Sequence, residues 1–178
     1  MQIPFTAYAD DCTVRGEIAL GVDRLSDLLS STTEYEVSGA AFRALDDGHV
    51  VECDSAAVLR DDLCMVVASG PRGRVDRRLW TCQHPVRARV GPYVVLGYLH
   101  APPTIDPMRT TDRRPIVALT NCVVGYAEGQ HSMWVENDTL LVNTTKIDVL
   151  ETAHPEDLGL ASSVDLPTMV DKRAKDLT

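Results

Sequence analysis

The sequence TVRGEIAL at Thr13–Leu20 and the sequence VVLGYLHA at Val94–Ala101 decide how the chain folds. In both stretches apolar and β-branched residues recur with the two-residue period of a strand that buries one face. A glycine, Gly16 or Gly97, occupies the fourth position of each stretch, and a glycine inside a strand usually marks a bend or a bulge. The stretches lie 81 residues apart, so we expect two copies of one unit.

The same shift relates further parts of the chain. It places Ala41–Leu45 over Cys122–Tyr126 and Gly48 over Gly129. After a two-residue insertion in the second copy, the alignment resumes over the following pair of ranges: Val58–Val67 and Leu141–Leu150. The shared order of strands and glycines, more than residue identity, predicts the duplication.

Each copy is expected to contain five short strands, and a bent second strand favours closure of the sheet into a small barrel. We therefore predict an all-β fold of two tandem small five-stranded β-barrel-like repeats with a C-terminal tail. The expected boundaries are 1–69 for the first repeat, 70–85 for an Arg/Gly/Pro linker, 86–150 for the second repeat and 151–178 for a tail or docking arm.

Local signals refine these repeats. Leu25, Leu28 and Leu29 have helical spacing and follow Asp23, a suitable N-cap, so a short helix is expected over 23–30. The last two strands of each copy should pivot at Arg60–Asp62 and at Asn143–Thr145. The tail contains few large apolar residues and needs a surface to lie on, with these candidate anchors: Leu158, Leu160, Leu166, Met169 and Val170.

Charge is distributed in blocks. The net charge is −9, yet the middle of the chain is rich in arginine. An electropositive patch would attract phosphate or an acidic protein surface, whereas the alternative is that these arginines pair with the protein's own carboxylates. Trp80 is either an interaction hot spot or a plug between the two barrels. The candidate interaction residues are Arg72, Arg74, Arg77, Arg78, Trp80, Arg87, Arg89, Arg109, Arg113 and Arg114.

Catalytic and metal-binding motifs are absent from the sequence. It contains no G-x-S-x-G elbow, P-loop, Rossmann glycine pattern, H-E-x-x-H or metal-spaced Cys/His cluster. The five cysteines are odd in number and include no C-x-x-C pair, which favours reduced core thiols. A catalytic dyad could arise only from the fold, for example from Cys53 or Cys64 with His49. We predict no metal, no cofactor and no catalytic residue.

A family resemblance is carried by Val95–Leu99, which contains a G-x-L motif, and by Leu140–Val149 near the end of the second copy. These segments resemble the strand layout of Sm-like small β-barrels, in which a polar turn between the last two strands contacts RNA. In this chain Arg60-Asp61 and Asn143-Thr144 stand at that turn, in place of the family's Arg-Gly pair. Arg24–Leu29 and Leu141–Asn143 also resemble tandem bacterial domains of unknown function.

These patterns favour a non-enzymatic protein-interaction or structural subunit of a larger assembly, which binds an acidic protein surface or self-assembles. The alternative is binding of RNA or single-stranded nucleic acid through residues 72–114, with Trp80 or Tyr93 stacking on bases. A small-molecule binder or enzyme with a pocket between the barrels is the third hypothesis. No apolar run reaches the ~20 residues of a membrane span, and no signal peptide is evident at Met1, so a cytoplasmic location is expected.

Overall fold

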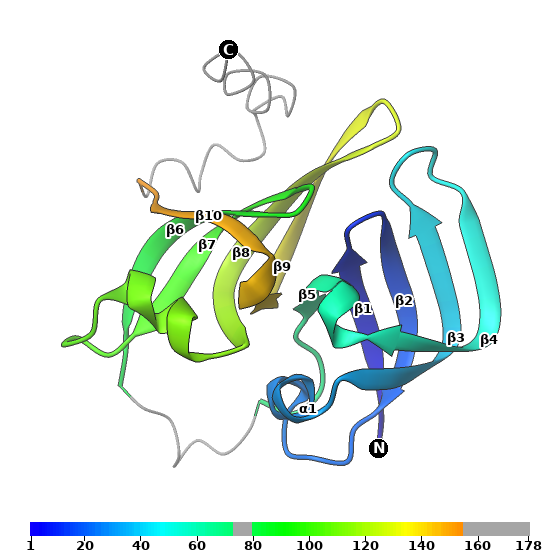
Figure 1. Ribbon diagram of the computed structural model, residues 1–178, viewed down its shortest axis with the longest axis horizontal. Helices are drawn as coiled ribbons and strands as arrows, with labels where there is room; N and C mark the ends of the chain where they lie inside the picture. The colour runs from blue at the N-terminus through cyan, green and yellow to red at the C-terminus, as the bar shows by residue number, and fades with distance from the viewer. Residues whose placement is uncertain (73–79, 155–178) are drawn as a thin grey trace.

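Ten strands form one antiparallel sheet in the described part of the chain (Figure 1). The computed structural model describes residues 1–72 and 80–154. The all-β fold expected from the alternating pattern is confirmed, with α1 (Leu25–Ser31) as the one α-helix among the described residues. The sheet is open, with the strand order β10-β6-β7-β8-β9-β5-β1-β2-β3-β4.

The strands fall into two groups along the chain. The first half contains β1 (Gln2–Ala9), β2 (Cys12–Ala19), β3 (Glu34–Ala44), β4 (Val50–Leu59) and β5 (Leu63–Val67). The second half contains β6 (Cys82–Val90), β7 (Tyr93–Ala101), β8 (Ile116–Glu128), β9 (His131–Asn143) and β10 (Ile147–Thr152). Short 3₁₀ helices occupy Arg60–Asp62, Pro107–Arg113 and Thr144–Lys146.

Both halves have the same internal strand order. The last strand of each half pairs with the first, which gives β5-β1-β2-β3-β4 and β10-β6-β7-β8-β9. The halves are joined by antiparallel pairing of β5 with β9, so the hydrogen-bonded ladder runs through both without a break. The structure therefore describes one continuous open sheet, and it leaves β4 and β10 as the two edge strands.

The mid-strand glycines bend their strands as expected. The register of β2 against β3 shifts between Arg15 and Glu17, around Gly16, and that of β7 against β8 shifts between Leu96 and Tyr98. A Cβ atom on Gly16 would lie 2.7 Å from the backbone oxygen of Ser38, so the neighbouring strand approaches too closely for any side chain.

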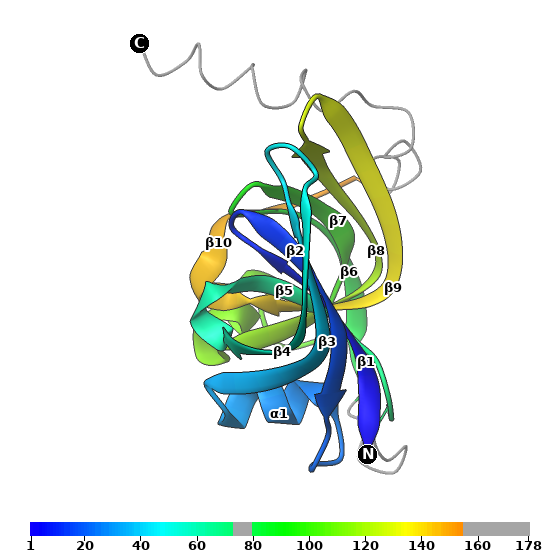
Figure 2. The same ribbon diagram turned by 90° about the vertical axis from the view of Figure 1, so that its right-hand side faces the viewer.

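Two large hydrophobic clusters form most of the core beside a small one at Leu96 and Ala153, and each of the two large clusters takes residues from both halves. Ile116 and Leu141 of the second half belong to the cluster of the first half. Tyr8 and Met65 of the first half belong to the cluster of the second. Figure 2 shows the long β8–β9 hairpin rising above the other strands, with α1 at the opposite end of the molecule. The two halves are thus packed together as one body.

Several expected boundaries differ from the structure. The N-cap of α1 is Arg24 and not Asp23, because Arg24 is still extended (φ −145°, ψ 153°). The helix is held by the buried side chains of Leu25 and Leu29. Strand β6 begins at Cys82, inside the expected linker, and β10 ends at Thr152, inside the expected tail. Pairing with β7 extends β6 back to Cys82, and pairing with β6 extends β10 to Thr152, so both strands pass the limits that local composition suggested.

Candidate functional site

The arginines of the candidate interaction set pair with the protein's own carboxylates at several positions. Arg87 and Arg89 alternate along β6, where their guanidinium groups lie 3.6 Å from Glu151 and 3.5 Å from Asp148 of β10. Two further ion pairs join Arg72 to Asp138 at 3.6 Å and Arg109 to Asp106 at 3.9 Å. Each such exposed pair contributes about 0–1 kcal/mol to stability.

Of the remaining candidate arginines, the structure describes the side chain of one, Arg114. Arg114 is exposed. Arg74, Arg77 and Arg78 lie outside the described residues, as does the side chain of Arg113. The expected tail anchors also lie outside them: Leu158, Leu160, Leu166, Met169 and Val170.

The two aromatic residues considered for contact with a partner differ in exposure. Trp80 is 80% exposed, so it does not fill the space between the halves and remains available for contact. Tyr93 is fully buried, so the hypothesis that it stacks on nucleic-acid bases is wrong. Its hydroxyl donates to the backbone oxygen of Ala9 at 2.6 Å, which ties β7 to the end of β1.

A cluster of tyrosines fills the junction between the halves. Tyr8 of the first half meets Tyr93 and Tyr126 of the second with ring centroids 5.3 Å and 6.0 Å apart, and the rings pack edge to face. Burial raises the pKa of all three hydroxyl groups above the ordinary value. The sequence showed these residues only as aromatic positions in strands, because their contact depends on pairing between distant segments.

A polar contact closes the same junction at the turn between β1 and β2. The Lys146 ammonium group donates to Asp10 at 2.7 Å, and the Cys64 thiol donates to the other oxygen of that carboxylate at 3.2 Å. The hydrogen bond from Lys146 lowers the pKa of Asp10. Burial, followed by the Asp10 carboxylate, raises the pKa of Cys64 to about 12. This thiol therefore stays protonated at neutral pH and is a poor nucleophile.

The other cysteines divide between core and surface. Cys122 is buried, and burial raises its pKa to about 12. Cys12 and Cys82 are partly buried. Cys53 is exposed on β4, so the expectation of core thiols is wrong at this position. An edge strand lacks the neighbour that would cover it.

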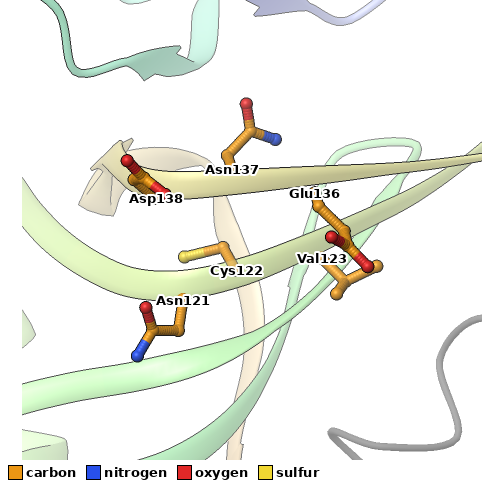
Figure 3. Close-up of a pocket in the computed structure, with 6 residues that line it drawn as sticks. All are labelled: Asn121, Cys122, Val123, Glu136, Asn137 and Asp138. Carbon is orange, nitrogen blue, oxygen red and sulfur yellow. The ribbon is translucent and has the colours of Figure 1, made fainter.

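A polar hollow of about 480 Å³ lies along the β8–β9 hairpin. It is lined by Asn121, Cys122, Val123, Glu136, Asn137 and Asp138. Figure 3 shows that the side chains of Asn121 and Asn137 point in opposite directions, so these groups do not converge on one ligand position. The hollow therefore lacks the arrangement of polar groups that typifies a small-molecule site.

The two edge strands are the remaining candidate for interaction. Strand β4 is exposed along most of its length, and its uncovered apolar side chains include Val51 and Leu59, which are 54% and 47% exposed. At the other end of the sheet, the residues of β10 are only half-buried or exposed. Edge strands present unpaired backbone N–H and C=O groups, which are a template for pairing with another chain. We take β4 and β10 together as the candidate interaction site.

Comparison with protein-family models, with curated proteins and with solved structures finds no match for this chain. Within residues 1–72 and 80–154, no group of three or more His, Cys, Asp or Glu side chains is arranged to hold a metal ion. The same part of the chain contains no helix that is both long enough and apolar enough to span a membrane.

Proposed function

We propose that this protein is a non-enzymatic structural or interaction subunit of a larger assembly, which self-assembles or binds another protein. The observation that carries the proposal is the open ten-stranded sheet, whose edge strands β4 and β10 have no strand neighbour on their outer sides among the described residues. Natural proteins usually protect long sheet edges, and an unprotected edge with exposed apolar side chains favours association.

The proposal includes an internal duplication of a five-stranded barrel-like unit. It is supported by the common strand order of the two halves. The bulge at Gly16 recurs 81 residues later at Gly97. A 3₁₀ turn also precedes the last strand of each half, at Arg60–Asp62 and at Thr144–Lys146. Two such units in one chain supply two interaction edges that differ in kind.

Nucleic-acid binding has weaker support. The net charge of −9 repels a phosphate backbone at long range, and several arginines of residues 72–114 already lie beside carboxylates. Of the two residues expected to stack on bases, Tyr93 is buried and Trp80 is exposed.

Two measurements on the purified full-length protein test the proposal. Size-exclusion chromatography with light scattering should give a mass above that of one chain, or a stoichiometric complex with a co-purifying protein identified by mass spectrometry. Fluorescence anisotropy with labelled single-stranded RNA should show no binding at physiological salt. RNA binding with a clear log–log dependence on salt concentration would transfer support to the nucleic-acid function.

A further inference from the structure

The junction between the halves shows how two edges of this sheet type pair. Strand β5 runs antiparallel to β9, with Met65 opposite Val142, Val66 opposite Leu141, and Val67 opposite Leu140. All three partners on β9 are almost fully buried. Cross-strand pairs of apolar side chains are a main source of sheet stability, so this short ladder is an effective joint.

The edge strands β4 and β10 occupy the same positions in their halves as β9 and β5, the two strands of that joint. β4 corresponds to β9, because each is the fourth strand of its half and leads into a 3₁₀ turn. β10 corresponds to β5, because each follows that turn and pairs with the first strand of its half. One end of the sheet therefore offers a β9-like edge, and the other end offers a β5-like edge.

We infer that a second copy of this chain adds its β10 antiparallel to β4, and so repeats the β5–β9 joint between molecules. This inference rests on the proposed function and specifies its partner. The joint is head-to-tail, because a different edge of each molecule takes part. Head-to-tail contacts of this kind generate closed rings or open filaments, and not a symmetric two-fold dimer.

The position of each residue in its strand gives the register. Met65 is the third residue of β5, and Val149 is the third residue of β10. Val142 precedes the last residue of β9, and Val58 precedes the last residue of β4. Val149 of one molecule should therefore lie opposite Val58 of the next. The adjacent pairs are then Leu150 with Ala57 and Glu151 with Ala56.

Burial supports this pairing. Leu140 and Leu141 on β9 are 0% and 4% exposed in the joint between the halves. Their counterparts on β4 are Ala56 and Ala57, of which Ala56 is half-buried and Ala57 is exposed. Leu59, which is 47% exposed, ends the same strand. These positions have the exposure expected of the same joint without its partner strand.

Charge supports the same register over its alternatives. A slip of two residues in one direction would place Glu151 opposite Asp54, and a slip in the other direction would carry Asp148 and Val149 past Leu59, the last residue of β4. Like charges directly opposite each other destabilise a sheet. A slip of one residue would exchange the buried and exposed faces of the added strand. The inferred register is free of these problems, since it faces Glu151 with Ala56 and Asp148 with Leu59.

Disulfide trapping tests the register in the full-length protein. All variants carry Cys53→Ser, because Cys53 is exposed on β4 and would form competing cross-links. Ala57→Cys and Leu150→Cys are made in separate preparations, which are then mixed under mild oxidation. We expect a covalent two-chain species from the mixture and little from either preparation alone. Replacing Leu150→Cys by Glu151→Cys is the control, since that side chain points to the opposite face and should lower the yield several-fold.

A mutation that blocks the edge gives a second readout. Ala57→Lys places a charge at the centre of the inferred joint, whereas Ala118→Lys places the same charge on an exposed alanine of β8, an interior strand whose neighbours are both present. Ala57→Lys should reduce the native mass to that of one chain while the circular dichroism spectrum stays that of the folded wild type, and Ala118→Lys should leave the mass unchanged.

The outcomes separate this inference from the proposed function. An assembled protein whose mass is unchanged by Ala57→Lys, or a strong cross-link from Ala57→Cys alone, would overturn the β4–β10 joint and leave the proposed function in place. A wild-type chain that is monomeric and forms no cross-link overturns the joint as well. In that case the proposed function stands only with a different protein as the partner.

Discussion

Replacing Tyr93 with phenylalanine should weaken the joint between the halves by a measurable amount. The Tyr93 hydroxyl donates to the Ala9 oxygen at 2.6 Å and lies 3.3 Å from the Cys12 oxygen, in a fully buried position. The variant keeps the ring contacts with Tyr8 and leaves a buried carbonyl without this donor. Such a loss costs about 1–2 kcal/mol in unfolding free energy. For a protein of this size, that corresponds to a melting temperature lower by roughly 3–6 °C.

Urea denaturation followed by circular dichroism measures this effect directly. Tyr98→Phe is the matched control, because Tyr98 lies on the same strand and is only half-buried, so its loss should stay within about 0.5 kcal/mol. An equal loss in both variants, or a Tyr93→Phe variant as stable as wild type, would show that the hydroxyl does not hold the halves together. An unchanged m-value is expected, since the compactness of both states is preserved.

Three further predictions concern pH, backbone approach and charge. The free energy of unfolding should fall as pH rises above about 9 and be restored on return to neutral pH, because burial raises the pKa of Cys64 from 9.0 to about 12 and the unfolded chain loses this proton first. A free energy of unfolding that stays constant from pH 9 to 11 in denaturation experiments would contradict this. Gly16→Ala should lower the free energy of unfolding by about 1–3 kcal/mol because the added Cβ clashes with β3, whereas Gly21→Ala should be nearly neutral because nothing lies within 4 Å of its Cβ. Equal melting temperatures for the two variants would refute the close approach of β3 to Gly16. The double variant Arg77→Glu/Arg78→Glu should lower the native mass or release a bound partner, and added salt should act in the same direction because exposed charges are screened within about 8–10 Å. Assembly that is insensitive to both changes would show that these arginines do not contribute to it.

The strand pattern and the turns were predictable because they depend on local sequence. Gly16 and Gly97 indicated a bend, and a register shift occurs at each. The pivot expected at Arg60–Asp62 is a 3₁₀ turn, and the second pivot is a similar turn displaced by one residue to Thr144–Lys146. Side-chain alternation and turn residues act over a few residues, so a single sequence contains the information.

The pairing of β5 with β9 was not predictable in the same way. An apolar strand such as Leu63–Val67 is compatible with closure of its own barrel and with pairing to another unit, since the periodicity is identical in both cases. The choice depends on contacts such as the tyrosine junction, which brings Tyr8 against Tyr93. Of the two roles considered for Trp80, the structure contradicts the plug, since Trp80 is 80% exposed and tyrosines fill the junction.

The candidate site was predictable only in outline. An interaction role was expected from the blocks of charge, and the structure shows Arg87 and Arg89 beside carboxylates of β10. Neither edge strand was identified from the sequence, because edge position is a property of the sheet order and not of local composition. For this reason Cys53 was expected to be a core thiol, whereas it is exposed because β4 is uncovered on both faces over most of its length.

The native mass of the wild-type chain in solution tests most directly whether this protein is a subunit of a larger assembly. One chain has a mass of 19.5 kDa. Light scattering over a series of concentrations should give a mass that is a multiple of this value, or that of a defined complex with another protein, at the higher concentrations. A mass of one chain throughout the series, with no protein co-purifying, would contradict the proposal that this protein is a subunit of a larger assembly.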